Sequence, residues 1–133
     1  MNRIYTLPEA NQILPLVRAV AREYHERRSL RQALRKERDM LERAVTPEGL
    51  RLELSELDAR IAEQDEGLFR CRREFEAMGM KVLQSNPLTI HIRGQNRTGE
   101  VVFCWEEGEA NVCHGHECGH EQDGRRPLRL KSA

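Results

Sequence analysis

The stretch TPEGLRLELSELDARIAEQDEGLFRCRREFEAMGM, residues 46–80, decides the fold. Its seam positions alternate at spacings of four and three residues, and only a helix places such positions on one side. The seam consists of Leu50, Leu54, Leu57, Ile61, Gln64, Leu68, Cys71, Phe75 and Met78. Thr46 can cap a helix whose first turn contains Pro47, and Gly79 can end it. The stretch therefore predicts a helix over about residues 47–78.

A second long helix is predicted upstream, over about residues 7–45. Thr6 and Glu9 form a capping-box pattern around Pro8, a residue that the first turn of a helix tolerates. Apolar or small residues follow at helical spacing, namely Ile13, Leu14, Val17, Val20, Ala21, Tyr24, Leu30, Leu34, Leu41 and Val45. Arg27, Arg31 and Arg38 take positions that a dry core would give to leucine. We expect their stems to cover apolar surface while their guanidinium groups stay hydrated.

The charges of the two predicted helices are complementary. Residues 1–45 carry ten basic and six acidic side chains, a net charge of +4, whereas residues 46–80 carry five basic and nine acidic side chains, a net charge of −4. A short connection forces the helices to run antiparallel, so that the opposite charges face each other. We interpret the arginine-rich run from Arg18 to Arg38 as half of this charge match rather than as a nucleic-acid-binding stripe. Because a two-helix hairpin leaves little shielded core, we expect a homodimer formed through the helices.

Beyond the second helix the sequence changes from helical to alternating periodicity, after a break over residues 78–87. Residues 89–92, residues 101–105 and a segment through Val112 and Cys113 are predicted as strands. Residues 96–99 and the pair Gly108-Glu109 are predicted as the turns between them. The fold class is therefore predicted to be α+β, a long antiparallel two-helix hairpin followed by a small three-stranded antiparallel β-meander. We divide the chain into a hairpin over residues 1–80 and a meander with a Cys/His-rich tail over residues 87–133, packed as one domain.

The expected strand register pairs Ile92 with Val101, Ile90 with Phe103 and Cys104 with Cys113. One face of the sheet then gathers Ile90, Ile92, Val101, Phe103, Trp105 and Val112. We expect this apolar face to pack on the helices. The other face gathers Thr89, His91, Val102, Cys104 and Cys113.

The run CHGHECGH, residues 113–120, holds five thiol or imidazole side chains in eight residues. Thiolate and imidazole are the donors that Zn²⁺ prefers, and glycines let a short segment fold around an ion. Cys104 can be added from the neighbouring strand. We therefore predict a zinc site whose preferred ligands are Cys104, Cys113, His116 and Cys118, with His114 and His120 as substitutes.

Other interpretations of the cysteines remain open, because the spacing matches no standard zinc finger. In one, Cys104 and Cys113 are half-buried sheet residues and the histidines are solvated. A disulfide between Cys104 and Cys113 is geometrically feasible, but the reducing compartment expected for this chain disfavours it. Cys71 lies on the helical seam and is expected to be an inert, buried thiol.

Composition restricts the function of the chain. Its 133 residues carry 22 basic and 22 acidic side chains, so it lacks the basic excess typical of nucleic-acid binders. It has no apolar run long enough to span a membrane, and its amino terminus has no apolar signal core, so we expect a cytoplasmic protein. Without a phosphate-binding loop or a known catalytic motif, a binding or structural module is the main hypothesis, and no catalytic residue is assigned.

Two alternative functions are kept. The first is a metal-dependent enzyme centred on His116 and Glu117, with Arg125 available to bind an anionic group. The second is a metal-sensing or nucleic-acid-associated regulator that uses the face from Arg18 to Arg38.

Both ends of the chain carry a family pattern. The first end reads Tyr5-Thr6-Leu7-Pro8-Glu9-Ala10-Asn11 with Ile13-Leu14-Pro15, and the second contains Gly99-Glu100-Val101, Cys104-Trp105, Gly108-Glu109, His116-Glu117 and Gly124-Arg125 with Pro127-Leu128. In these segments the chain resembles the bacterial family catalogued as domain of unknown function 2203, which has no assigned activity.

The resemblance has two implications for the tail. The family usually reads Trp-His-Glu where this chain has Gly115-His116-Glu117, so Cys113, His114, Cys118 and His120 are particular to this chain. The family's recurring Gly-Arg-x-Pro-Leu ending, here residues 124–128, implies that this segment closes the small sheet, with Arg125 bridging to a carboxylate such as Glu117 or Glu109.

Overall fold

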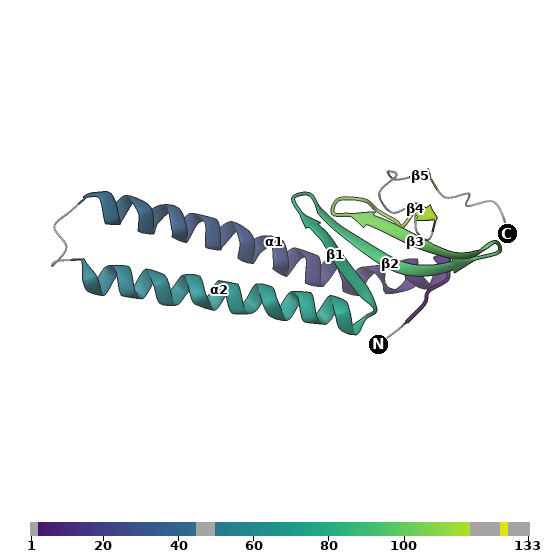
Figure 1. The fold of residues 1–133 in the computed structure, drawn as a ribbon, viewed down its shortest axis with the longest axis horizontal. Helices are drawn as coiled ribbons and strands as arrows, with labels where there is room; N and C mark the ends of the chain where they lie inside the picture. The colour runs from purple at the N-terminus through teal and green to yellow at the C-terminus, as the bar shows by residue number, and fades with distance from the viewer. Residues whose placement is uncertain (1–2, 45–49, 118–125, 128–133) are drawn as a thin grey trace. The chain divides into compact units, whose positions relative to one another are not determined.

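The structure is a computed structural model that describes residues 3–44, 50–117 and 126–127 (Figure 1). The fold class is α+β, as predicted, with a two-helix hairpin followed by an antiparallel sheet. In chain order the elements are α1 (Leu7–Ala44), α2 (Arg51–Ala77), β1 (Met80–Ser85), β2 (Leu88–Asn96), β3 (Gly99–Glu106), β4 (His114–Glu117) and β5 (Arg126–Pro127).

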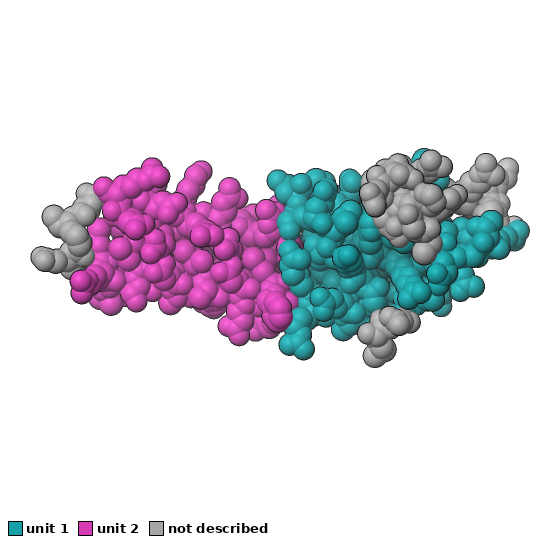
Figure 2. Space-filling view, in the orientation of Figure 1, with its two compact units in different colours: residues 1–21, 72–133 teal, residues 22–71 magenta. Residues whose placement is uncertain are grey.

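The chain divides into two compact units (Figure 2). Residues 22–71 form the helical unit, which consists of the later turns of α1 and most of α2. Residues 1–21 and 72–133 form the sheet unit, which combines the sheet with the first turns of α1 and the last turns of α2.

In the helical unit, the shielded side of α2 is the predicted seam. Leu54, Leu57, Ile61, Gln64, Leu68 and Cys71 are buried or half-buried, and most of the residues between them are exposed. The predicted stripe of α1 is wrong at Leu30, which is 43% exposed. Leu30 turns outward because the neighbouring Arg27 and Arg31 take the places that face α2 and contact Gln64 and Asp65 there.

The predicted charge match holds between the two helices. Arg31 pairs with Asp65 and Arg38 pairs with Asp58, while the Arg27 guanidinium donates to Gln64 Oε1 at 3.2 Å. Arg38, which lies later in α1 than Arg27 and Arg31, thus meets a residue that lies earlier in α2 than their partners, as the antiparallel arrangement requires. Such partly exposed ion pairs are worth at most about 1 kcal/mol each, so they align the helices more than they hold them together.

Neither α1 nor α2, the two helices of the described residues, is apolar enough along its length to cross a membrane.

In the sheet unit the strands are ordered β1-β2-β3-β4-β5, and each is antiparallel to its neighbours. Strands β2 and β3 correspond to the first two strands of the predicted meander. The third strand was predicted through Val112 and Cys113, but these residues lie in the connection and β4 begins at His114. The break expected over residues 78–87 is wrong, because β1 occupies most of it and pairs with β2 from Met80↔Ile92 to Ser85↔Leu88. Strand β5 was not predicted as a strand, but its pairing with β4 joins Arg126 and Pro127 of the Gly-Arg-x-Pro-Leu ending to the sheet, as the family resemblance implies. Both additions lie at the edges of the meander and extend it without reordering it.

The hairpin of β2 and β3 keeps its predicted faces but not its predicted pairs. Asn96 pairs with Gly99, so Ile92 faces Phe103 and Ile90 faces Trp105, two positions away from the expected register. Because side chains alternate with a period of two, this shift leaves the composition of each face unchanged. The predicted apolar face is buried in full, from Ile90 and Ile92 at 0% exposed to Val101 at 8%.

The hairpin of β3 and β4 differs from the prediction by one residue, and this difference exchanges the two faces of β4. Cys104 pairs with His114 rather than with Cys113, and Val102 pairs with His116. The connection runs from Glu107 to Cys113 instead of turning tightly at Gly108-Glu109. His114 and His116 therefore lie on the face of the sheet that carries Cys104 and His91.

The first turns of α1 hold this long connection in place. Val112 donates its backbone N–H to Asn11 Oδ1 at 2.7 Å, and Asn11 Nδ2 donates to the Val112 carbonyl at 3.3 Å. Arg18 donates to the backbone carbonyls of Glu109, at 3.3 Å, and of Ala110. The start of β4 is thus positioned by two side chains of α1 that lie about a hundred residues earlier in the chain.

The predicted capping box begins α1 and fixes its entry to the sheet unit. Thr6 donates its backbone N–H to Glu9 Oε1 at 2.8 Å, and Glu9 donates its backbone N–H to Thr6 Oγ1 at 3.3 Å. The hydrogen bonds from Thr6 hold the pKa of the Glu9 carboxyl below its usual value. One residue earlier, Tyr5 exchanges backbone hydrogen bonds with Arg93 and Gln95 of β2.

Replacing Asn11 tests whether α1 holds the connection. Asn11→Ala removes both hydrogen bonds between the Asn11 side chain and Val112. The backbone N–H and carbonyl of Val112 then lack these partners, so we expect the free energy of unfolding to fall by about 1–3 kcal/mol. Urea denaturation measures the change. Gln12→Ala alters the exposed neighbour on the same helix and should change the free energy by less than about 0.5 kcal/mol. Equal effects of the two substitutions would contradict the proposed role of Asn11.

Candidate metal centre

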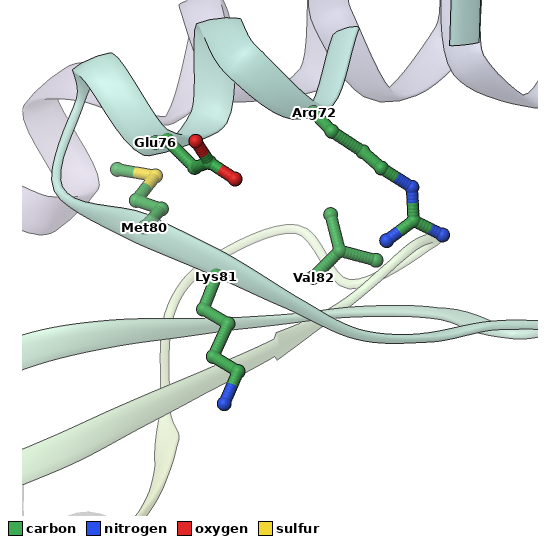
Figure 3. A pocket seen from close by; sticks show the side chains of 5 residues that line it. All are labelled: Arg72, Glu76, Met80, Lys81 and Val82. Atoms are coloured by element: carbon green, nitrogen blue, oxygen red, sulfur yellow. The ribbon is translucent and has the colours of Figure 1, made fainter. Parts of the chain in front are cut away.

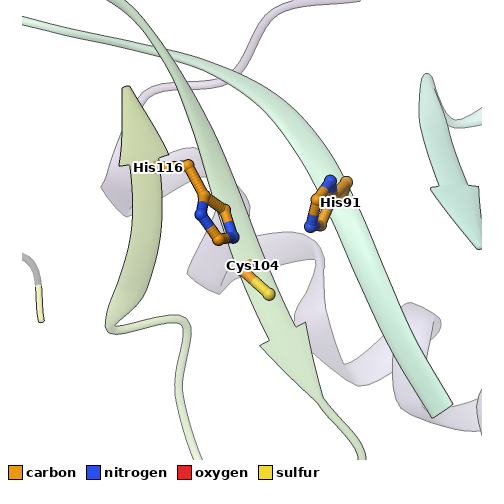
Figure 4. Close-up of side chains that lie close together, drawn as sticks. All are labelled: His91, Cys104 and His116. Atoms are coloured by element: carbon orange, nitrogen blue, oxygen red, sulfur yellow. The ribbon is translucent and has the colours of Figure 1, made fainter. Parts of the chain in front are cut away.

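Three metal-ligating side chains from three neighbouring strands converge on one face of the sheet. His91 comes from β2, Cys104 from β3 and His116 from β4, and Cys104 lies between the two imidazoles (Figure 4). One donor atom of each residue lies within 4.8 Å of a donor atom of the other two. The imidazole centroids are 5.1 Å apart and the rings are tilted by 50°.

All three side chains are buried. His91 is 8% exposed, His116 is 6% exposed and Cys104 is 1% exposed. Within the described residues, the buried Nδ1 of His116 has no hydrogen-bond partner. A buried polar atom without a partner is costly, and a ligand at that atom would remove the cost.

The strand pattern explains why these three side chains meet. His91 and Cys104 are directly paired across β2 and β3, so they share a face. His116 is paired with Val102, which lies two positions before Cys104 on β3 and therefore on the same face. The observed register of β4 thus brings the second imidazole to this site.

A second group of donors lies where β4 begins. Glu109, Cys113 and His114 bring a carboxylate oxygen, a thiol sulfur and an imidazole nitrogen within 4.8 Å of one another. His114 Nδ1 lies 3.2 Å from Glu109 Oε2 and 3.4 Å from Cys113 Sγ. All three side chains are half-buried, so this group is more accessible than the first.

The residues predicted from the sequence are distributed over these two groups. Cys104 and His116 belong to the buried group, whereas Cys113 and His114 belong to the half-buried one. Glu117 is the last residue of β4 and pairs with Val101. Cys118, His120 and Arg125 lie outside the described residues. The described chain therefore divides the predicted donors between two places rather than gathering them at one.

Two donors were not predicted. His91 was expected on the face of Cys104 but was not counted as a ligand, although strand alternation already placed the two together. Glu109 was assigned to a turn, and its role depends on the length of the connection, which the local sequence does not reveal. Cys71 is a buried cysteine on the helical seam, in the position expected for it.

A hollow in the sheet unit offers a different chemistry. Between the end of α2 and β1, it is lined by Arg72, Glu76, Met80, Lys81 and Val82 (Figure 3). Met80 and Val82 point toward α2, whereas the Lys81 side chain leaves the opposite side of β1. Besides these apolar side chains, the polar groups that line the hollow are the Arg72 guanidinium and the Glu76 carboxylate. The metal donors of the sheet are therefore the stronger candidate site.

Comparison with known proteins decides the family. The family model described as "Uncharacterized conserved protein (DUF2203)" matches residues 3–128. The chain belongs to this family. The resemblance inferred from both ends of the sequence is thus confirmed, and the match includes the helical middle. No curated protein and no solved structure matches the chain. The DUF2203 description carries no activity, so the function has to be argued from the site.

Proposed function

We propose that this DUF2203 protein is a metal-binding module that holds one transition-metal ion between His91, Cys104 and His116. The observation that carries the proposal is the convergence of three buried donors, one from each of three neighbouring strands, within 4.8 Å of one another. An ion at this position would join β2, β3 and β4 through side chains in addition to their backbone hydrogen bonds.

The donor set favours Zn²⁺. Two imidazoles and a thiolate are borderline and soft ligands, which suit zinc better than magnesium or calcium. Around a tetrahedral zinc ion with ligand distances of about 2.0–2.3 Å, neighbouring donor atoms lie roughly 3.3–3.8 Å apart. Because the donor atoms lie within 4.8 Å of one another, the three side chains would need to close by at most about 1.5 Å, which is within reach of small side-chain rotations.

Burial favours a structural role for the ion over a catalytic one. Structural zinc sites are closed by protein ligands, while catalytic sites keep a position open to water or substrate. Zinc takes four ligands, so the proposal requires a fourth donor. Cys118 follows His116 by two residues in the sequence and is the first donor to test.

The other functions considered from the sequence are less well supported than this proposal. A metal-dependent enzyme centred on His116 and Glu117 is the alternative, and turnover that requires both residues would support it. A regulator that binds nucleic acid through the run from Arg18 to Arg38 has less support, because Arg27, Arg31 and Arg38 contact acidic or amide side chains. A cytoplasmic location is proposed with the metal site, since reduced thiols suit that compartment.

Removing the donors should remove the metal. We expect chain purified without a polyhistidine tag and saturated with zinc to lose about one equivalent of zinc when Cys104→Ser and His116→Ala are combined. Elemental analysis of the desalted protein measures the loss. Zinc should also raise the melting temperature of the unchanged chain, because a ligand at about one hundred times its Kd adds roughly 2.7 kcal/mol to stability.

Cys71→Ser is the matched control, because Cys71 is as buried as Cys104 but lies on the helical seam. It should leave the zinc content unchanged. An unchanged zinc content in the double variant would show that the three side chains form a packed polar cluster instead, and the proposal would then be wrong.

We also propose that the helical unit pairs with a second copy of the chain. Within residues 22–71 the large apolar side chains of Leu30, Met40, Leu52 and Phe69 are exposed. Met40 also lines a shallow hollow with Ala33, Lys36, Glu37 and Leu41 along one side of α1. Two helices bury one side each, and a second hairpin would complete a four-helix bundle.

Sedimentation equilibrium tests this pairing. The unchanged chain should have about twice the 15.5 kDa mass of one copy. Met40→Glu places a charge on the apolar surface and should shift the protein toward the monomer, whereas Gln32→Glu, at an exposed polar position of the same helix that does not line the hollow, should not. A monomeric unchanged chain at high protein concentration would rule the pairing out.

A further inference from the structure

The connection between β3 and β4 carries its own set of metal donors. Glu109, Cys113 and His114 share no residue with the buried group of His91, Cys104 and His116. They provide one oxygen, one sulfur and one nitrogen donor. This mixture suits a borderline transition metal, because calcium and magnesium prefer oxygen ligands throughout.

The distances between these donors fit an ion between them. Adjacent ligand atoms of tetrahedral zinc lie on the order of 3.3–3.6 Å apart when the ligand distances are those of nitrogen, oxygen and sulfur. His114 Nδ1 is 3.2 Å from Glu109 Oε2 and 3.4 Å from Cys113 Sγ. These two separations are close to those that a shared ion requires, and all three donor atoms lie within 4.8 Å of one another.

The backbone around these donors is held by contacts that do not use the donor atoms. Glu109 Oε1 accepts the backbone N–H of Glu106 at 2.8 Å, which orients the carboxylate and directs Oε2 toward His114. The Glu109 carbonyl accepts hydrogen bonds from Trp105 Nε1 at 3.0 Å and from Arg18 at 3.3 Å. Such supporting hydrogen bonds around a ligand are typical of metal sites and strengthen metal binding.

Accessibility separates this group from the buried one. The side chain of His114 is 29% exposed and that of Glu109 is 22% exposed. An ion from solution can reach these donors without opening the sheet. Half-buried thiol, imidazole and carboxylate groups also lose less hydration on binding than fully buried groups.

We infer that Glu109, Cys113 and His114 form a second transition-metal site, which takes Zn²⁺ directly from solvent. Its ligands are the carboxylate, the thiolate and the imidazole, and the fourth position is filled by water or by another donor. This site goes beyond the metal centre proposed above and stands independently of it, because the two ligand sets do not overlap.

Titration of the metal-depleted full chain tests the inference. Co²⁺ is the probe, since its thiolate complexes absorb in the near ultraviolet, and a chromophoric chelator competing for Zn²⁺ measures affinity. We expect about two equivalents of zinc per chain, with Cys113→Ser and His114→Ala each losing about one equivalent. Glu109→Gln keeps the size of the side chain and the hydrogen bond from the Glu106 backbone N–H. It should raise the Kd for the zinc ion of this site at least about tenfold.

Two variants serve as controls. Glu107→Gln removes a carboxylate from the same connection, and His25→Ala removes an exposed imidazole from α1. Neither should change the stoichiometry. Because Glu109→Gln is isosteric, it remains informative even if Cys113→Ser disturbs the fold.

The outcomes distinguish the two sites. A single equivalent that is lost in Cys104→Ser and retained in Cys113→Ser and Glu109→Gln would overturn the second site and leave the buried one standing. A single equivalent that is retained in Cys104→Ser and lost in Cys113→Ser would support the second site and overturn the buried one. Absence of stoichiometric zinc would overturn both.

Discussion

The alignment of β4 against β3 determines which side chains meet on the sheet. With Cys104 opposite His114, the imidazole of His116 shares a face with His91 and Cys104. A shift of one residue would turn His116 to the apolar face and separate the three donors. The metal centre that we propose therefore depends on one strand register, and this register is set from outside the hairpin, by Asn11 and Arg18 of α1.

This arrangement gives the first turns of α1 a role beyond packing. Asn11 holds Val112, the residue just before Cys113, and Arg18 holds the carbonyls at Glu109 and Ala110. The same contacts thus support the start of β4 and the half-buried donors of the connection.

Within the helical unit the constraint is different, because Arg27, Arg31 and Arg38 interrupt the apolar stripe of α1 and contact polar side chains of α2. Such pairs specify alignment at little gain in stability.

Sequence periodicity was sufficient for the helices and for the apolar face of the sheet. The seam from Leu54 to Cys71 and the face from Ile90 to Trp105 could be predicted because each repeats a local spacing. Leu30 could not be placed correctly, because its exposure depends on which arginines take the positions that face α2.

Strand β1 was missed because a break was expected at residues 78–87, and its sequence MKVLQS has little alternation in hydrophobicity. Local turn chemistry suggested a tight hairpin at Gly108-Glu109, whereas contacts with α1 stabilise the longer connection. Of the buried group, Cys104 and His116 were among the donors predicted from the sequence, whereas His91 was not, and whether the group binds a metal stays a prediction.

Anomalous scattering at the zinc absorption edge, measured on a crystal of the zinc-loaded chain, tests the central claim most directly. The account predicts a peak at bonding distance, about 2.0–2.3 Å, from donor atoms of His91, Cys104 and His116 together. A zinc-loaded crystal in which these three side chains contact one another, with no anomalous peak between them, would contradict it.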